Sequence, residues 1–236
     1  MKKTHGILIG SDARQEWLLP WWWENYQRSN QYPVSCVDFG LSKRARAWCE
    51  ERIELISLSI NPLFLKNREE IDQIFITEWE DRYPNGFWHS RESWFKKAEA
   101  CLRSPYEKTI WMDVDCEVVG SLEFLFQIPG IALAKDPIVS NSQYPIYNSG
   151  VIVFEKRHPL LFQWAKLSLE KNGFFRGDQD LLSQIIETEK HPIFELSPIY
   201  NWSVGEKERE DVVIYHWLGD AAKTVLRNKL MVSLSF

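Results

Sequence analysis

Three features that would each indicate a particular class of protein are missing from this sequence. No two of its four cysteines form a CxxC pair, and each lies in or beside an apolar run. No apolar run approaches the roughly 20 residues that a membrane-spanning helix needs. There is no basic surplus, because the formal net charge is -5, whereas nucleic-acid-binding proteins usually carry an excess of Lys and Arg. We therefore expect buried free thiols, no transmembrane helix and no nucleic-acid partner.

The chain also shows no internal repeat, no low-complexity tract and no clear linker. Its 236 residues suit one large domain, so we predict a single domain over residues 1–236. The apolar segment within the opening MKKTHGILIG is too short for a signal peptide, and we expect a cytoplasmic protein. The C-terminal KTVLRNKLMVSLSF mixes basic and apolar residues. That mixture suits at most a peripheral contact with a membrane surface, and a packed final helix or strand is favoured.

Tryptophan, in contrast, is abundant. The chain has 12 tryptophans, and Trp21–Trp23 are consecutive. Large aromatic side chains mostly fill the core of a protein, but three in a row on a helix cannot all face one core. We expect at least one of them to lie at the rim of a groove, where an aromatic face could stack on a sugar ring.

Apolar runs and helical patterns alternate along the first quarter of the chain. The runs at His5–Ile9, Val34–Val37 and Ile53–Ile60 predict strands, separated by helices at Glu16–Tyr26 and from an N-cap at Ser42 through Glu51. This alternation is typical of an α/β domain with a mainly parallel sheet. The region 61–90 has no regular pattern. Later predicted elements are helices at Arg91–Leu102, His158–Lys171 and Asp178–Ile186, and strands at Lys108–Met112, Ile131–Ala134, Val151–Phe154 and Val212–Trp217.

Two aspartates, Asp113 and Asp115, directly follow the predicted strand Lys108–Met112. In open α/β sheets, ligands gather at the carboxyl ends of strands. Residues i and i+2 of an extended chain point to the same side, so both carboxylates would face one spot while Val114 points away. Two hard oxygen ligands at one spot suit Mg²⁺ or Mn²⁺. A DxD triplet alone is a weak signal, because many are solvated turns.

Three other stretches carry polar residues in positions that could serve the same site. YNSGVIVF places Asn148 and Ser149 ahead of an apolar strand, GDQDLLS begins a helix, and YHWLGDAAK places His216 near a strand end. The last two have a plain structural explanation as well. Acidic residues are favoured in the first turn of a helix, and a lone histidine is often a hydrogen-bonded core residue.

Taken in this order, the DxD, the NSG, the DQD and the HxxG with a nearby lysine resemble the nucleotide-sugar glycosyltransferases of the GT-A fold, and among them glycosyltransferase family 8. The resemblance extends from ILIGSD in the first strand to about Lys223, which is nearly the whole chain. Its best-matched parts are IWMDVDCEVVGSLEFLF, YNSGVIVF, GDQDLLS and HWLG. It implies a GT-A fold: a single Rossmann-like domain with a mainly parallel, mixed central sheet flanked by helices.

The resemblance also implies a role for individual residues. Mn²⁺, or Mg²⁺, would be bound by Asp113, Asp115 and His216. The donor-binding set would be Ser11, Asp12, Lys97, Asp113, Val114, Asn148, Ser149, Gly219 and Lys223, with Lys96 as an alternative to Lys97. Asp178, Gln179 and Asp180 would be the catalytic group beside the donor sugar. The chain departs from the family's HxxGxxK, because Ala222 stands at the expected place and Lys223 follows one position later.

The function implied is the transfer of a hexose from a nucleoside diphosphate sugar, UDP-glucose or UDP-galactose, to an acceptor hydroxyl with retention of configuration. The acceptor would be a glycan, a lipid-linked oligosaccharide or another hydroxyl compound. An alternative is a non-catalytic module that binds a nucleotide sugar or a glycan. A haloacid-dehalogenase-like phosphatase also has a DxD after a strand. Its motif, however, lies at the first strand and is normally followed two places later by Thr or Val, where this chain has Glu117.

Overall fold

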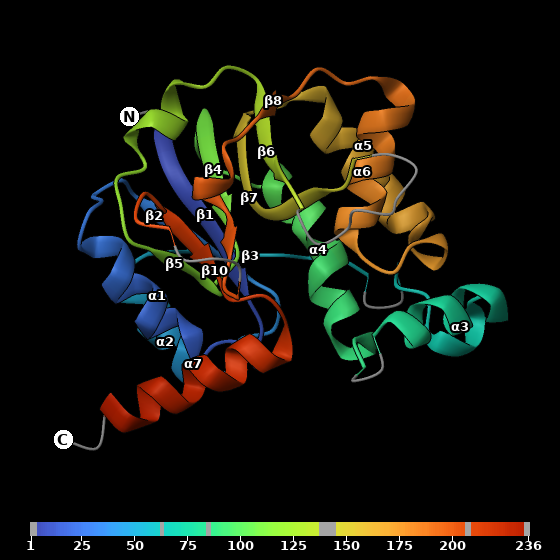
Figure 1. Ribbon diagram of the computed structural model, residues 1–236, viewed down its shortest axis with the longest axis horizontal. Helices are drawn as coiled ribbons and strands as arrows, with labels where there is room; N and C mark the ends of the chain where they lie inside the picture. The colour runs from blue at the N-terminus through green and yellow to red at the C-terminus, as the bar shows by residue number, and fades with distance from the viewer. Residues whose placement is uncertain (1–3, 62–63, 84–85, 137–144, 206–208, 234–236) are drawn as a thin grey trace.

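Seven strands form the central sheet in a computed structural model of this chain, which describes residues 4–61, 64–83, 86–136, 145–205 and 209–233 (Figure 1). The strands lie in the order β3-β2-β1-β4-β7-β6-β8. They are β3 (Glu54–Ser57), β2 (Val34–Asp38), β1 (His5–Ser11), β4 (Lys108–Met112), β7 (Tyr147–Glu155), β6 (Ile131–Lys135) and β8 (Phe194–Glu195).

The central sheet is mainly parallel, as predicted, with one strand reversed. Neighbouring strands from β3 to β4 are parallel, and β8 is parallel to β6. Strand β7 is antiparallel to both of its neighbours, β4 and β6. Because β7 runs backwards, its first residues lie at the carboxyl end of β4. The polar start of β7 is thereby placed beside the aspartates that follow β4.

A second, three-stranded sheet brings the C-terminal part of the chain to the same place. It consists of β5 (Cys116–Val118), β10 (Ile214–His216) and β9 (Trp202–Ser203), with β10 in the middle. Strand β10 is antiparallel to β5, and their register pairs His216 with Cys116. A residue about 100 positions away from the aspartates in the sequence is therefore next to them in space.

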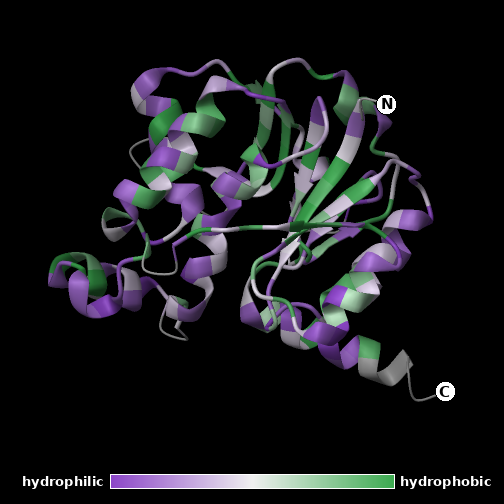
Figure 2. Ribbon diagram, turned by 180° about the vertical axis from the view of Figure 1, so that it is seen from behind, coloured by the Kyte–Doolittle hydropathy of each residue, from purple (hydrophilic) through white to green (hydrophobic). Residues whose placement is uncertain are grey.

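Helices cover both faces of the central sheet. They are α1 (Leu18–Gln27), α2 (Lys43–Glu50), α4 (Arg91–Leu102), α5 (Pro159–Glu170), α6 (Asp178–Glu189) and α7 (Gly219–Ser233). Helix α3 (Gln73–Arg82) lies away from the sheet and packs in a separate hydrophobic cluster (Figure 1). Successive residues of β1 point to opposite faces, so Ile7 and Ile9 pack with α1 and α2, whereas Leu8 packs with α4, α5 and α6. Figure 2 shows hydrophobic residues along the strands and hydrophilic residues over much of the helices.

Several local predictions are confirmed and others need correction. The Ser42 side chain caps α2 by accepting a hydrogen bond from the Ala45 backbone, and all four cysteines are buried free thiols. Strand β3 is shorter than the predicted Ile53–Ile60, and the region 61–90 contains the unpredicted helix α3. The C-terminal stretch forms α7 as far as Ser233, and its last three residues lie outside the described part. No helix in the described ranges has the length and apolar character that crossing a membrane requires.

The sheet core supplies the first prediction. Ile152 lies at the centre of β7 with 0% of its surface exposed, so Ile152→Ala should lower the free energy of unfolding by roughly 2–5 kcal/mol in urea titrations. Phe162→Ala is the matched control, because that side chain is 52% exposed on α5, and its effect should stay within about 0.5 kcal/mol. Equal losses in the two variants would contradict the assignment of Ile152 to the core.

Candidate active site at the carboxyl ends of the strands

The site is organised around the point where β4 ends and β7 begins. Met112 pairs with Val151 in the antiparallel register, and one step further the Asp113 N–H donates a hydrogen bond to the Gly150 carbonyl at 2.8 Å. Asp113 and Asp115 then lie in a turn, closed by a hydrogen bond from the Cys116 N–H to the Asp113 carbonyl. The two carboxylates meet different partners because the chain turns instead of continuing as a strand.

Lys97 is the buried cation of the first group. Its Nζ atom lies 3.0 Å from Asp113 Oδ2 and 3.3 Å from Asp178 Oδ2, and it donates to Ser149 Oγ at 3.1 Å. Ser149 Oγ in turn donates to Asp178 Oδ2 at 2.8 Å. Burial alone would lower the pKa of Lys97, but the two aspartates raise it overall, so the group stays charged. The structure thus brings Lys97 to the aspartates, while Lys96 binds the Phe39 carbonyl and Glu92 instead.

Asp115 anchors the second group. Its Oδ1 lies 3.2 Å from His216 Nε2, and its Oδ2 lies 2.6 Å from Lys223 Nζ. Burial alone would raise the pKa of Asp115, but the neighbouring Lys223 and His216 lower it well below its usual range. For Asp113, burial outweighs Lys97 and raises the pKa. The pKa values of the two acids of the DxD are therefore shifted in opposite directions.

Gly150 makes room for the histidine. A Cβ atom at this position would lie 2.6 Å from His216 Nδ1, closer than real Cβ contacts allow. The ring therefore packs directly on the strand backbone. A glycine within a strand pattern often marks such a close approach, and this is the physical reason for the third residue of the NSG stretch.

The DQD residues begin α6 and face three different partners. Asp178 belongs to the Lys97 group. Gln179 accepts a hydrogen bond from the Ser149 N–H at 3.3 Å and donates to Asp136 Oδ2 at 2.8 Å. Asp180 pairs with Arg176 at 3.2 Å, and burial raises its pKa. Asp178 and Gln179 thus join the cluster around Ser149, whereas Asp180 belongs to a separate ion pair.

The remaining predicted residues lie at the borders of this cluster. Asp12 caps the turn after β1 by accepting from the Arg14 and Gln15 N–H groups, and its Oδ2 accepts from Ser93 Oγ at 2.6 Å. Ser93 and Lys97 are one turn apart on α4, so this helix connects Asp12 with the aspartate cluster.

Three predicted donor-binding residues have mainly structural surroundings. Ser11 is buried, and its hydroxyl donates to the Asp12 carbonyl at 3.3 Å. The Val114 side chain is 2% exposed and packs in the core, so only its backbone is left for a ligand. Gly219 has a φ of +77°, which favours glycine, and begins α7.

The donor atoms around Asp115 fit a divalent ion. Within the described residues, Asp115, Cys116 and His216 form a group of possible ligands whose atoms lie within 4.8 Å of one another; the Asp113 carboxylate is not part of that group. Burial raises the pKa of the Cys116 thiol, which leaves the carboxylate and the imidazole as ligands. Adjacent ligands of an octahedral ion with bonds near 2.1 Å lie about 3 Å apart, and Asp115 Oδ1 and His216 Nε2 are 3.2 Å apart. Three carboxylates against two ammonium groups also leave the cluster receptive to a cation.

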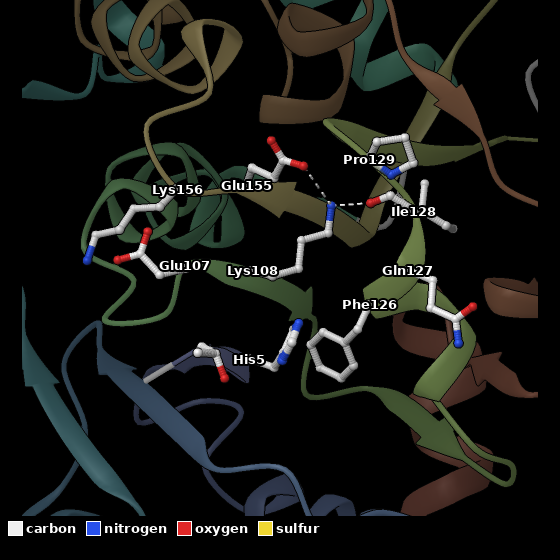
Figure 3. Close-up of a pocket in the computed structure, with 10 residues that line it drawn as sticks. His5, Glu107, Lys108, Phe126, Gln127, Ile128, Pro129, Glu155 and Lys156 are labelled. Atoms are coloured by element: carbon white, nitrogen blue, oxygen red, sulfur yellow. Dashed lines mark hydrogen bonds and ion pairs between the residues drawn. The ribbon is translucent and has the colours of Figure 1, made fainter. Parts of the chain in front are cut away.

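Two of the cavities that described residues line lie outside this cluster. One of about 520 Å³ is at the opposite edge of the sheet, between the starts of β1 and β4 and the end of β7 (Figure 3). In it, Lys108 points toward the Ile128 carbonyl and Glu155, and burial lowers the pKa of this lysine. The other, of about 310 Å³, is lined by Asp38, Lys96 and neighbouring residues at the carboxyl ends of β2 and β3, on the same edge as the aspartates.

Several residues that the motifs did not indicate are also part of the site. Asn201, Ser93, Asp136 and Arg176 each bind a predicted residue, but nothing in the sequence near them marks a site. Gly150, in contrast, belongs to the NSG stretch that the sequence already indicated. Of the consecutive tryptophans, Trp22 is buried and stacks on Tyr26 at 5.1 Å, whereas Trp21 and Trp23 are partly buried against the core.

The fold matches solved structures of glycosyltransferases. The galactosyltransferase LgtC, in complex with donor and acceptor sugar analogs, is 15% identical with a TM-score of 0.66, and the alignment covers 92% of this chain and 88% of LgtC. The glycosyltransferase GlyE of Streptococcus pneumoniae TIGR4 is 14% identical with a TM-score of 0.62, covering 93% of this chain and 55% of GlyE. Mouse xyloside xylosyltransferase 1 is 14% identical with a TM-score of 0.56, covering 90% and 97%.

At the level of sequence, neither a family model nor a curated protein matches the chain. The structural similarity nevertheless shows the architecture: this chain has the GT-A-like fold of these glycosyltransferases. The fold class that the sequence predicts is thereby confirmed. At these identities the similarity shows the fold alone.

The packing of His216 on the strand backbone supplies the second prediction. In Gly150→Ala the new Cβ should push the imidazole away from Asp115, so the affinity for Mn²⁺, measured by titration calorimetry, should fall by about tenfold or more. Gly173→Ala is the control, because its Cβ would meet only the flexible Lys66 side chain, at 3.3 Å. Unchanged Mn²⁺ binding in Gly150→Ala would contradict a ligand role for His216.

Proposed function

We propose that this protein is a metal-dependent glycosyltransferase that moves a hexose from a nucleoside diphosphate sugar to an acceptor hydroxyl. The observation that carries the proposal is the conjunction of Asp113, Asp115 and His216 with the buried Lys97 and the partly buried Lys223 at the carboxyl end of β4, in a chain with a GT-A-like fold. UDP-glucose or UDP-galactose as donor, a glycan or lipid-linked oligosaccharide as acceptor, and retention of configuration are proposed from the family resemblance.

Asp115 and His216 would hold Mn²⁺ or Mg²⁺, and Asp113, on the same loop, would be the third ligand residue. When bound, the ion would supply positive charge against the diphosphate leaving group. Lys223 would act on the same group, because its ammonium already lies in the cluster, 2.6 Å from Asp115. A positive charge that is already fixed beside the leaving group stabilises the negative charge that develops there, which is an effective form of catalysis. This keeps Lys223 in the proposed site despite its shifted place in the motif.

Asp178 and Gln179 would border the donor sugar. Lys97 and Ser149 hold the Asp178 carboxylate, and Gln179 is oriented by the Ser149 backbone and Asp136. One of the matching structures is an active-site mutant of LgtC in which glutamate replaces a glutamine, at 15% identity and a TM-score of 0.59. That protein therefore has a glutamine in its active site, which favours Gln179 as the first residue to test beside the anomeric carbon.

Donor hydrolysis and transfer assays with UDP-sugars and Mn²⁺ test the function directly. Asp113→Asn and Asp115→Asn should abolish both activities and the Mn²⁺-dependent thermal shift with UDP. For a ligand at ~100 times its Kd that shift corresponds to about 2.7 kcal/mol. Asp81→Asn, an exposed aspartate on α3, is the control and should behave as wild type. Binding without any turnover would favour the nucleotide-sugar-binding module, and a fully active Asp115→Asn would overturn the ligand assignment.

The role of Gln179 gives a separate prediction. If its side chain lies beside the reacting carbon, Gln179→Ala should lower kcat by roughly 10²-fold or more while changing the KM for the donor much less, because the lost contact serves the transition state. Gln163→Ala on α5 is the matched control and should leave both constants unchanged. A variant that raises KM and keeps kcat would instead assign Gln179 to donor binding.

A further inference from the structure

Asn201 lies at a position that no sequence motif indicated. It lies between a short 3₁₀ helix, Pro198–Tyr200, and β9, and only 6% of it is exposed. Strand β9 is parallel to β10 and pairs Ser203 with His216, so Asn201 approaches the histidine from the side opposite to Asp115. Its amide group joins Asn148 to His216: Nδ2 lies 2.9 Å from Asn148 Oδ1, and Oδ1 lies 2.8 Å from His216 Nδ1.

A backbone group fixes the direction of these hydrogen bonds. The Gly150 N–H can only donate, and it lies 2.8 Å from Asn148 Oδ1, so that atom must be the acceptor oxygen. The Asn201 group that meets the same oxygen must then be its NH₂. The other end of the Asn201 amide is consequently its oxygen, and this oxygen faces His216 Nδ1. An oxygen acceptor requires that Nδ1 carries the hydrogen.

The consequence for His216 concerns its second nitrogen. In a neutral imidazole with hydrogen on Nδ1, Nε2 has a lone pair, and this lone pair faces Asp115 Oδ1 at 3.2 Å. Two acceptor atoms then face each other, an arrangement that a cation between them stabilises. Asn148 and His216 are 4% and 2% exposed, so water has little access to replace the amide contacts.

We infer that Asn148 and Asn201 form an amide relay, starting at the Gly150 backbone, that sets the tautomer of His216 and keeps Nε2 available for a divalent ion. Both asparagines are positioning residues in this role. The identity of the ion as Mn²⁺ or Mg²⁺ rests on the proposed function, whereas the tautomer does not. For Asn148, the inference adds an orienting role for its Oδ1, which is already bonded twice, to the expected contact with the donor sugar. Such outer contacts typically change metal affinity 10–100-fold when lost.

The first test needs no variant. ¹⁵N NMR of the histidine-labelled, metal-free protein, above the pH range in which imidazole takes up a second proton, reports which nitrogen of His216 carries the hydrogen. Gly150→Ala identifies its signals, because the new Cβ perturbs that ring alone among the histidines. The inference expects Nδ1–H with an unprotonated Nε2. The opposite tautomer, with hydrogen on Nε2, would overturn it.

The second test compares a variant that loses the oxygen acceptor for His216 Nδ1 with a variant that keeps the oxygen acceptors of the relay. Asn201→Leu removes the relay and should let hydrogen move to Nε2, with Mn²⁺ affinity in calorimetry, without any donor, falling about 10–100-fold. Asn148→Asp keeps an oxygen acceptor for both the Gly150 N–H and Asn201, and should keep the wild-type tautomer. If Asn201→Leu kept the wild-type tautomer of His216 and the wild-type affinity for Mn²⁺, the relay would be overturned, while the proposed metal-dependent function would stand. If wild type binds no Mn²⁺ even with UDP present, both the relay's purpose and the proposed metal-dependent function are overturned.

Discussion

The buried ammonium group of Lys97 is the contact on which the arrangement of the site depends. It joins three segments that are far apart in the sequence: the loop after β4 through Asp113, the start of β7 through Ser149, and the start of α6 through Asp178. Without it, two carboxylates would face each other in a largely buried position, and an uncompensated buried charge typically costs several kcal/mol. The helix, the strand and the loop can therefore meet at this edge only with a cation between them.

Much of this fold is visible in the sequence because the larger elements have clear periodicity. Strands β1, β2, β4 and β7 and helices α4, α5 and α6 come from apolar runs or helical faces that a core requires. Strand β10 lies within the predicted Val212–Trp217 but is shorter. Strands β5 and β9 have three and two residues, too few for any period, and exist only through their pairing with β10. Helix α3 escapes prediction for another reason: its Ile74 is 75% exposed while Ile76 and Trp79 are buried, which blurs the helical pattern.

The residues of the site can likewise be separated into those that the sequence indicates and those that it does not. Polar residues at strand and helix ends, such as Asp113, Asp115 and Asp178, are predictable because ligands collect there in α/β sheets. Lys97 and Lys223 lie inside helices and were implied only by the family resemblance. The structure places these residues and His216 together. The orientation of the two aspartates is less accessible, because it follows from a turn after β4 and not from an extended strand. The orienting residues Asn201, Ser93 and Asp136 reach the site only through tertiary packing, so no local pattern could reveal them.

Helix α4 contacts both the loop after β1 and the loop after β4. Its Ser93 holds Asp12 after β1, and its Lys97, one turn later on the same face, holds Asp113 after β4. Four residues of α-helix advance about 6 Å, a separation that no side-chain rearrangement can alter. Helix α4 therefore sets a fixed distance between two parts of the site. One is the loop after β1 with Asp12, which is expected to bind the nucleoside. The other is the loop after β4 with Asp113, which is expected to bind the diphosphate. A single residue inserted between Ser93 and Lys97 would rotate one relative to the other by about 100°, so the two side chains could no longer hold Asp12 and Asp113 at the same time.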